Sequence, residues 1–320
     1  NTAVGSLSLD ANTTANSNTA LGYNTLGANT TGASNVAVGA FALNNNATAN
    51  NNVAIGRNSM LVNTTGTDNV AIGAYTLDAN TTASSNTAIG KNALTANTTG
   101  PENTAIGDAV LDANTTGAYN TATGRNALGN NTTANNNAAF GHSALAANTT
   151  GTQNVAVGTT TLDANTTANN NSAIGYQALG ANTTGENNTS LGSFALLSNT
   201  TASNNTAIGK DALLLNTTGI ANVAVGANAL DANTTAGGNV AIGRNSLSAV
   251  TVNGGNTACG DSTLFANTGG NNSAFGNFAL GSNTTGTQNS AVGALALDAN
   301  TNAHNNNAFG YQALSSNTTG

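Results

Sequence analysis

Apolar and polar residues follow a 17-residue pattern that starts at Asn1 and is last repeated from Asn306. We number the positions of each unit from 1 to 17, starting at its leading Asn. Position 4 is usually Val, Ile, Leu or Phe, and position 9 is Leu in every unit except one, which has Met60. Nineteen units follow one another, and only one spacing between leading Asn residues differs, from Asn256 to Asn272, at 16 residues. A fixed short period of this kind predicts a solenoid or fibrous array.

Each unit predicts short strands joined by tight corners. In the unit from Asn86, residues 87–89 are Thr-Ala-Ile, which predicts a three-residue strand with its β-branched side chains on one face. The Gly that follows in every unit predicts a corner that needs positive φ or a close backbone approach. Residues 93–95 predict a second strand with Leu94 pointing inward, whereas residues 97–100 fit either a third strand or a turn.

The pattern therefore predicts an all-β fold, a parallel β-solenoid of the β-roll or β-helix kind with nineteen 17-residue repeats and an elongated rod shape. No segment has helical apolar spacing over the eleven or more residues that indicate a helix. We expect residues 1–320 to form a single repeat array, with units starting at Asn1, Asn18, Asn35 and so on to Asn306, as a segment of a longer fibre. The expected core is thin, with one Ile or Val and one Leu per coil, so ladders of Asn amides would add hydrogen bonds along the axis.

Composition narrows the class of protein. Charged residues make up 5% of the chain, against roughly 25% in ordinary soluble proteins, which is compatible with a disordered polar tract. Two apolar positions kept in strict register argue against disorder. The net charge of −7 and the lack of a basic patch predict no nucleic-acid partner, and no apolar run is long enough for membrane insertion. The single cysteine, Cys259, is at the apolar position 4 and is expected to act as a small hydrophobe.

Residues with catalytic potential are spread along the chain, whereas an active site gathers unlike residues. All five Lys and Arg residues occupy position 6, and His142 and His304 lie nine units apart. Asp recurs at position 10, but never in adjacent units, so a solvated face is favoured over a calcium site. We therefore predict no enzyme activity, no catalytic residues, no metal site and no cofactor.

The sharpest chemical signal is an Asn-x-Thr sequon at position 12, which predicts covalent glycans that would supply the hydration missing from charges. The alternative is a structural corner in which the sequon is a by-product. The candidate glycosylation sites are Asn12, Asn29, Asn46, Asn63, Asn80, Asn97, Asn114, Asn131, Asn148, Asn165, Asn182, Asn199, Asn216, Asn233, Asn283 and Asn317.

Two other surfaces are candidates for binding. A row of Thr hydroxyls at position 13, from Thr13, Thr30, Thr64, Thr81, Thr98 and their copies, resembles the arrays of ice-binding solenoids. Aromatic residues at positions 6 and 7 would favour contact with a partner, or lateral packing between fibres. These aromatic residues are Tyr23, Phe41, Tyr75, Tyr176, Phe194, Phe278 and Tyr311.

The strings Ser172-Ala-Ile-Gly-Tyr-Gln-Ala-Leu179 and Ala308-Phe-Gly-Tyr-Gln-Ala-Leu314 carry a family resemblance. With the Asn-Thr-Ala-Ile-Gly element, they resemble the repeats of trimeric autotransporter adhesin heads and of bacterial surface and phage tail-fibre-like proteins. The resemblance covers the whole chain. It implies a left-handed parallel β-roll in an extracellular, often trimeric, stalk or adhesin.

Together these observations predict a non-enzymatic structural fibre or filament that is extracellular or on the cell surface. Its expected partners are further copies of itself and covalent glycans. The alternatives are an adhesin or tail-fibre stalk that binds a surface partner, and an ice-binding solenoid.

Overall fold

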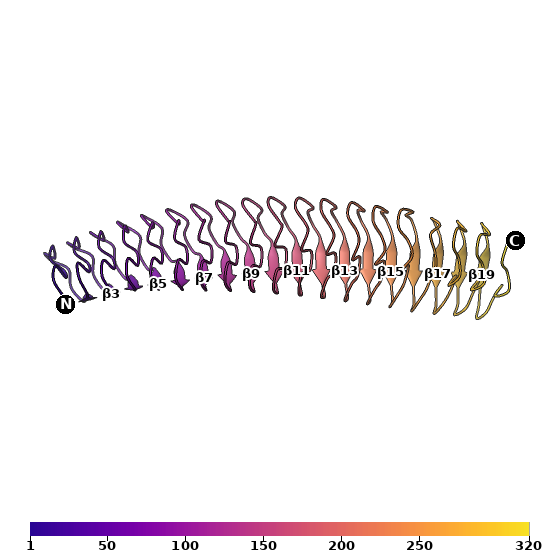
Figure 1. The fold of residues 1–320 in the computed structure, drawn as a ribbon, viewed down its shortest axis with the longest axis horizontal. Helices are drawn as coiled ribbons and strands as arrows, with labels where there is room; N and C mark the ends of the chain where they lie inside the picture. The colour runs from indigo at the N-terminus through magenta and orange to yellow at the C-terminus, as the bar shows by residue number, and fades with distance from the viewer. Residues whose placement is uncertain (320) are drawn as a thin grey trace. The chain divides into compact units, whose positions relative to one another are not determined.

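The structure, a computed structural model, describes residues 1–319 and confirms the predicted all-β solenoid. Nineteen parallel strands of three residues each are its only regular elements in that range, one strand for each repeat. The chain divides into two compact units, Asn1–Thr159 and Thr160–Gly320. Within each unit the strands lie in one row, with the turns of the coils on the other side (Figure 1).

The strands always cover positions 2 to 4 of the repeat. The first unit contains β1 (Thr2–Val4), β2 (Thr19–Leu21), β3 (Val36–Val38), β4 (Val53–Ile55), β5 (Val70–Ile72), β6 (Thr87–Ile89), β7 (Thr104–Ile106), β8 (Thr121–Thr123), β9 (Ala138–Phe140) and β10 (Val155–Val157). The second contains β11 (Ser172–Ile174), β12 (Thr189–Leu191), β13 (Thr206–Ile208), β14 (Val223–Val225), β15 (Val240–Ile242), β16 (Thr257–Cys259), β17 (Ser273–Phe275), β18 (Ser290–Val292) and β19 (Asn307–Phe309).

Within each unit, every strand pairs in parallel with the strand of the next coil, and equivalent positions face each other. In the first unit Ala88 of β6 pairs with Ala105 of β7, and in the second Ile174 of β11 pairs with Leu191 of β12. The 16-residue repeat that starts at Asn256 keeps this register, because Cys259 of β16 still pairs with Phe275 of β17. The missing residue is therefore absorbed outside the strand.

The predicted second strand does not form, because its residues adopt left-handed backbone conformations. Asn92 and Leu94 have φ of 58° and 52°, and residues 91–96 form turns. A strand needs negative φ at every residue, so the apolar Leu at position 9 marks a corner instead of a strand. The segment 97–100, for which strand and turn were both open, contains bends and no strand.

The interior also differs from the prediction at position 4. Ala54 in the middle of β4 is fully buried, whereas Ile55 beside it is 37% exposed. Successive side chains of a strand point to opposite faces, so positions 2 and 4 face outward together once position 3 faces inward. Met60 and the other position 9 side chains already fill the interior of the coil, and only Ala or another small residue fits beside them. The prediction that Ile or Val at position 4 packs in the core together with Leu is therefore wrong for Ile and Val.

Candidate functional surfaces and the interior asparagines

The Asn residues at position 12 form hydrogen-bonded ladders inside the coils. The side-chain amide nitrogen of Asn63 donates to the amide oxygen of Asn46 in the preceding coil at 2.9 Å, and to the carbonyl oxygen of Gly66 at 3.0 Å. The amide oxygen of Asn63 accepts from Asn80 at 2.8 Å. All three asparagines are fully buried. Each rung therefore satisfies both ends of its amide through the neighbouring coils and its own turn.

The leading Asn of each 17-residue repeat stabilises the same turn from the other side. The side chain of Asn52 donates to the Gly66 carbonyl at 2.9 Å, so this one oxygen accepts from both interior amides of its coil. The amide oxygen of Asn52 accepts the backbone N–H of Asn69 in the next coil at 3.0 Å. The two Asn positions thus close each coil and connect it to the next.

These contacts favour the structural-corner alternative at fourteen of the sixteen sequons, where glycans stay a prediction. A glycan attaches to the side-chain nitrogen, and in the folded coil that nitrogen is buried and hydrogen-bonded. Asn12 and Asn317 are only half-buried, and glycans there stay a prediction as well. The fourteen buried residues are Asn29, Asn46, Asn63, Asn80, Asn97, Asn114, Asn131, Asn148, Asn165, Asn182, Asn199, Asn216, Asn233 and Asn283.

One rung of the ladder is missing. Val250 occupies position 12 of the 17-residue repeat that starts at Asn239, and it is fully buried. The amide oxygen of Asn233, one coil earlier, has no hydrogen-bond partner among the described residues. A Val side chain has no donor, so it cannot satisfy the Asn oxygen beside it.

The two Thr positions have different environments. The hydroxyl of Thr64, at position 13, donates to the carbonyl oxygen of Thr81 in the next coil at 2.9 Å, and Thr98 bonds to Thr115 in the same way at 3.0 Å. Position 13 hydroxyls therefore stabilise the stack and are engaged by the backbone. The position 14 residues from Thr14 to Thr235 are all Thr and all exposed, which leaves one exposed row instead of the two that ice-binding faces need.

Aromatic residues at positions 6 and 7 pair between consecutive coils. Tyr23 and Phe41 pack edge to face with ring centroids 5.3 Å apart, as do Tyr176 and Phe194 at 5.2 Å. The guanidinium of Arg57 lies 5.4 Å from the ring centroid of Tyr75. Edge-to-face ring pairs and exposed cation–π contacts each contribute on the order of 1 kcal/mol.

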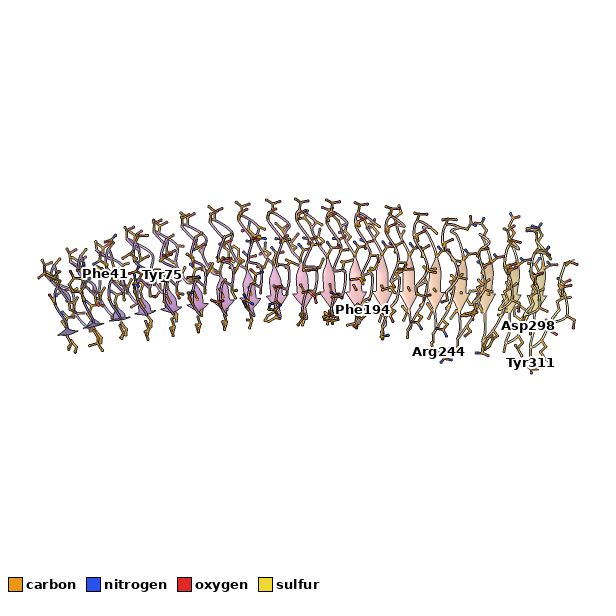
Figure 2. All side chains as sticks on the ribbon, in the orientation of Figure 1. Phe41, Tyr75, Phe194, Arg244, Asp298 and Tyr311 are labelled. Carbon is orange, nitrogen blue, oxygen red and sulfur yellow. The ribbon has the colours of Figure 1, made fainter. Side chains whose placement is uncertain are left out.

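Part of this aromatic surface remains open to solvent. Tyr23, Tyr176, Phe278 and Tyr311 are exposed, whereas the other three predicted aromatic contacts are half-buried. Figure 2 shows Phe194, Arg244 and Tyr311 along one margin of the second unit, on the strand side of the coils. The structure does not gather the seven aromatics into one pocket, because they come from coils spaced along both units.

Charged residues pair locally along position 6. Arg244 donates to Asp261 of the next coil at 2.8 Å, and this bond holds the pKa of Asp261 below its usual value and raises that of Arg244. Exposed pairs of this kind contribute little to stability. Within residues 1–319, no three His, Cys, Asp or Glu side chains are placed to hold a metal ion.

Three half-buried carboxyls of position 10 have raised pKa values. Burial raises the pKa of Asp78, Asp112 and Asp163 above the ordinary 3.8, while backbone hydrogen bonds partly oppose the shift. Tyr75, Asp78, Lys91, Asn92, Thr95 and Asp112 line a surface hollow. Its carboxyls lie two coils apart, as the sequence spacing indicated.

The outward face of the strands was missed by reasoning from the sequence. The signal was present, because the interior position of the strand is Ala in every unit except the one with Ser190, whereas positions 2 and 4 vary in size. A position that accepts only the smallest side chains indicates crowding. The Asn at position 1 of every repeat, and at position 12 of every repeat except the one with Val250, was the corresponding signal for buried amides.

The part of the chain that the structure describes holds no helix able to span a membrane. Comparison of the sequence with protein-family models, with curated proteins and with solved structures finds no match.

Proposed function

We propose that this chain is a non-enzymatic structural fibre protein that acts outside the cell or on its surface. The observation that carries the proposal is the repetition of one hydrogen-bonding scheme from coil to coil. Asn46, Asn63 and Asn80 illustrate it, since each donates to the coil before and accepts from the coil after. Such a chain extends by adding coils without changing local contacts, which suits a spacer or filament.

The distribution of polar chemistry supports the same role. The interior amides are engaged in holding the coils together, and no coil carries more than two Asp, Glu, Lys or Arg residues. A surface of amides and hydroxyls with 5% charged residues resists non-specific electrostatic binding. We infer that the surface is made by repetition and that no single coil is a unique site.

Immunogold electron microscopy of the cells that make the protein tests this proposal. Antibody raised against the folded chain should place gold along extracellular filaments or on the cell surface. Gold confined to the cell interior would contradict the proposal. An in-frame deletion of residues 188–204, one full unit, should leave the chain folded and shorten the stack by about 4.8 Å.

An adhesin or stalk that binds a surface partner is the second candidate, and the exposed rings of Tyr23, Tyr176 and Tyr311 favour it. Exposed aromatics are enriched where proteins contact partners. Replacement of these three Tyr residues by Ser should abolish adhesion of coated beads to the natural host surface if this candidate holds. Unchanged adhesion would leave the structural role alone.

A further inference from the structure

Within each compact unit the outward side chains of the strands form a continuous surface, which we call the sheet face and define as positions 2 and 4 of its 17-residue repeats. At position 4, Leu21 is 45%, Ile174 44% and Leu191 45% exposed. The in-register pairing sets each of these side chains beside its copy in the next coil, as with Ile174 and Leu191. The sheet face is thus a mostly apolar row of exposed and half-buried side chains, flanked by a row that is mostly Thr, Val and Ser.

The sheet face carries no charge. None of its thirty-eight side chains is Asp, Glu, Lys, Arg or His, although the chain holds such residues at position 6, two residues beyond the face. A soluble protein rarely leaves a contiguous apolar patch of more than a few hundred Å² open, and larger patches mark interaction sites. The charged residues border the face and leave its centre free for contact.

The area is large enough for a stable contact. Strands are about 4.8 Å apart, and two outward rows with their side chains are about 10 Å wide, so each coil presents about 50 Å². The ten strands of the first unit alone then bury about 1,000 Å² in total when two copies meet, which reaches the lower limit expected of a biological interface. The second unit carries the same pattern over nine strands.

We propose that the sheet face docks on the sheet face of a second copy of this chain. A second copy is the occupant whose rungs repeat at the same spacing, so that each outward row interdigitates with its counterpart along the stack. The two sheets would lie about 10 Å apart, as in face-to-face sheet packing. The small and β-branched side chains at position 2 leave room for the larger side chains at position 4 of the other copy. The inference rests on the structural role proposed above and specifies its lateral contact.

Size-exclusion chromatography with light-scattering detection measures the mass of the full-length chain in solution directly. The wild-type chain should elute at twice its monomer mass of 31.0 kDa. A wild-type mass of one copy, or of any number other than two, would overturn the proposal. Immunogold localisation is independent of this mass, so failure of the dimer and failure of the proposed extracellular role are distinguishable.

A matched pair of triple variants locates the contact. Ile174→Lys, Leu191→Lys and Ile242→Lys place charges on the sheet face, at side chains that are already exposed. The control carries the same added charge at other exposed positions of the same coils, through Thr184→Lys, Thr201→Lys and Val252→Lys. Circular dichroism should show that both variants keep the wild-type fold. On dilution the sheet-face variant should dissociate into monomers at a markedly higher protein concentration than the control; equal dissociation of the two variants would overturn the proposal.

Cys259 gives a second readout that does not depend on these variants. It is the only thiol of the chain, is half-buried and lies at position 4 of β16, on the sheet face. Its reaction with a bulky maleimide should slow at least tenfold as the protein concentration rises through the dimerisation range. A rate independent of concentration would contradict a contact at this face.

Discussion

The side-chain nitrogen of Asn63 lies 2.9 Å from the amide oxygen of Asn46, one coil earlier, and both residues are fully buried. This contact is the repeating link of the array. Its loss on Asn63→Ala also leaves the Gly66 carbonyl and Asn80 each short of one partner. Unsatisfied buried amides cost about 1 to 3 kcal/mol each, so we expect the free energy of unfolding to fall by about 2 to 4 kcal/mol.

Urea denaturation followed by circular dichroism measures this loss. The control is Thr65→Ala in the same coil, because Thr65 is exposed and no side-chain bond of it enters the ladder. A surface change of this kind alters stability by about 0.5 kcal/mol or less. Equal effects of the two substitutions would show that the ladder does not stabilise the coil.

The missing rung at Val250 predicts a stabilising substitution. Val250→Asn places a donor beside the unpaired amide oxygen of Asn233 and an acceptor beside Asn267 in the following coil. We expect a gain of about 1 kcal/mol, since the new hydrogen bonds outweigh the lost apolar burial. Val252→Asn, at an exposed position two residues later, should change stability little. A loss of stability in the Val250 variant would contradict the ladder's role.

The glycine at position 5 predicts a severe effect of a single methyl group. Gly90 has φ of 132°, and a Cβ there would overlap the carbonyl oxygen of Gly107 in the next coil. Gly90→Ala should therefore lower the thermal midpoint by at least 5 °C, while Ala96→Gly, at a half-buried turn position of the same coil, should have a smaller effect. Differential scanning calorimetry compares the two, and equal midpoints would refute the close approach of the coils.

The raised pKa of Asp112 predicts an unusual pH dependence. Burial makes the folded chain hold this proton more tightly than the unfolded chain, whose carboxyl titrates near 3.8. The stability that this bound proton contributes is fully present below pH 3.8, the unfolded-state pKa, and is lost as the pH rises through the folded-state pKa. Asp112→Asn should thus raise the thermal midpoint relative to wild type at pH 7 and change it less at pH 3.

The opposite shift at Asp261 provides the control. Arg244 lowers the pKa of Asp261, so the pair's contribution is present above the unfolded value of 3.8 and is lost as the pH falls through the folded-state pKa. Asp261→Asn should lower the midpoint slightly at pH 7 and have no effect at very low pH. Identical pH profiles for the two variants would contradict both assignments.

The repeat in the sequence was sufficient to predict the parallel stack, because the period of Asn1, Asn18 and Asn35 is independent of how each coil bends. The apolar character of the strand residues did not predict which side of the strand faces inward; the nearly invariant small residue at position 3 was the signal for it. Ile55 and Ala54 are both apolar, and the choice depends on how much space the turn residues leave inside a 17-residue coil. That space is set by left-handed residues such as Leu94, whose conformation the apolar pattern does not encode.

Prediction of the candidate sites was limited for the same reason, because the apolar pattern does not show which side chains face inward. The sequon at Asn29 is visible in the sequence, but its burial depends on the amide ladder, which forms only between coils. The aromatic pairs, such as Tyr23 with Phe41, follow from adjacent units and could have been predicted once the stacking was known. The proposed contact between two sheet faces depends on which side chains of each strand face outward, and the apolar pattern alone does not show this.

A cryo-EM map of the natively purified protein tests the central claim most directly. We predict coils about 4.8 Å apart, with the amides of Asn29, Asn46 and Asn63 inside the coil, no density beyond their side chains, and Ile55 on the outer face of the sheet. A map with sugar density on these asparagines, or with Ile55 packed inside the coil, would contradict the account.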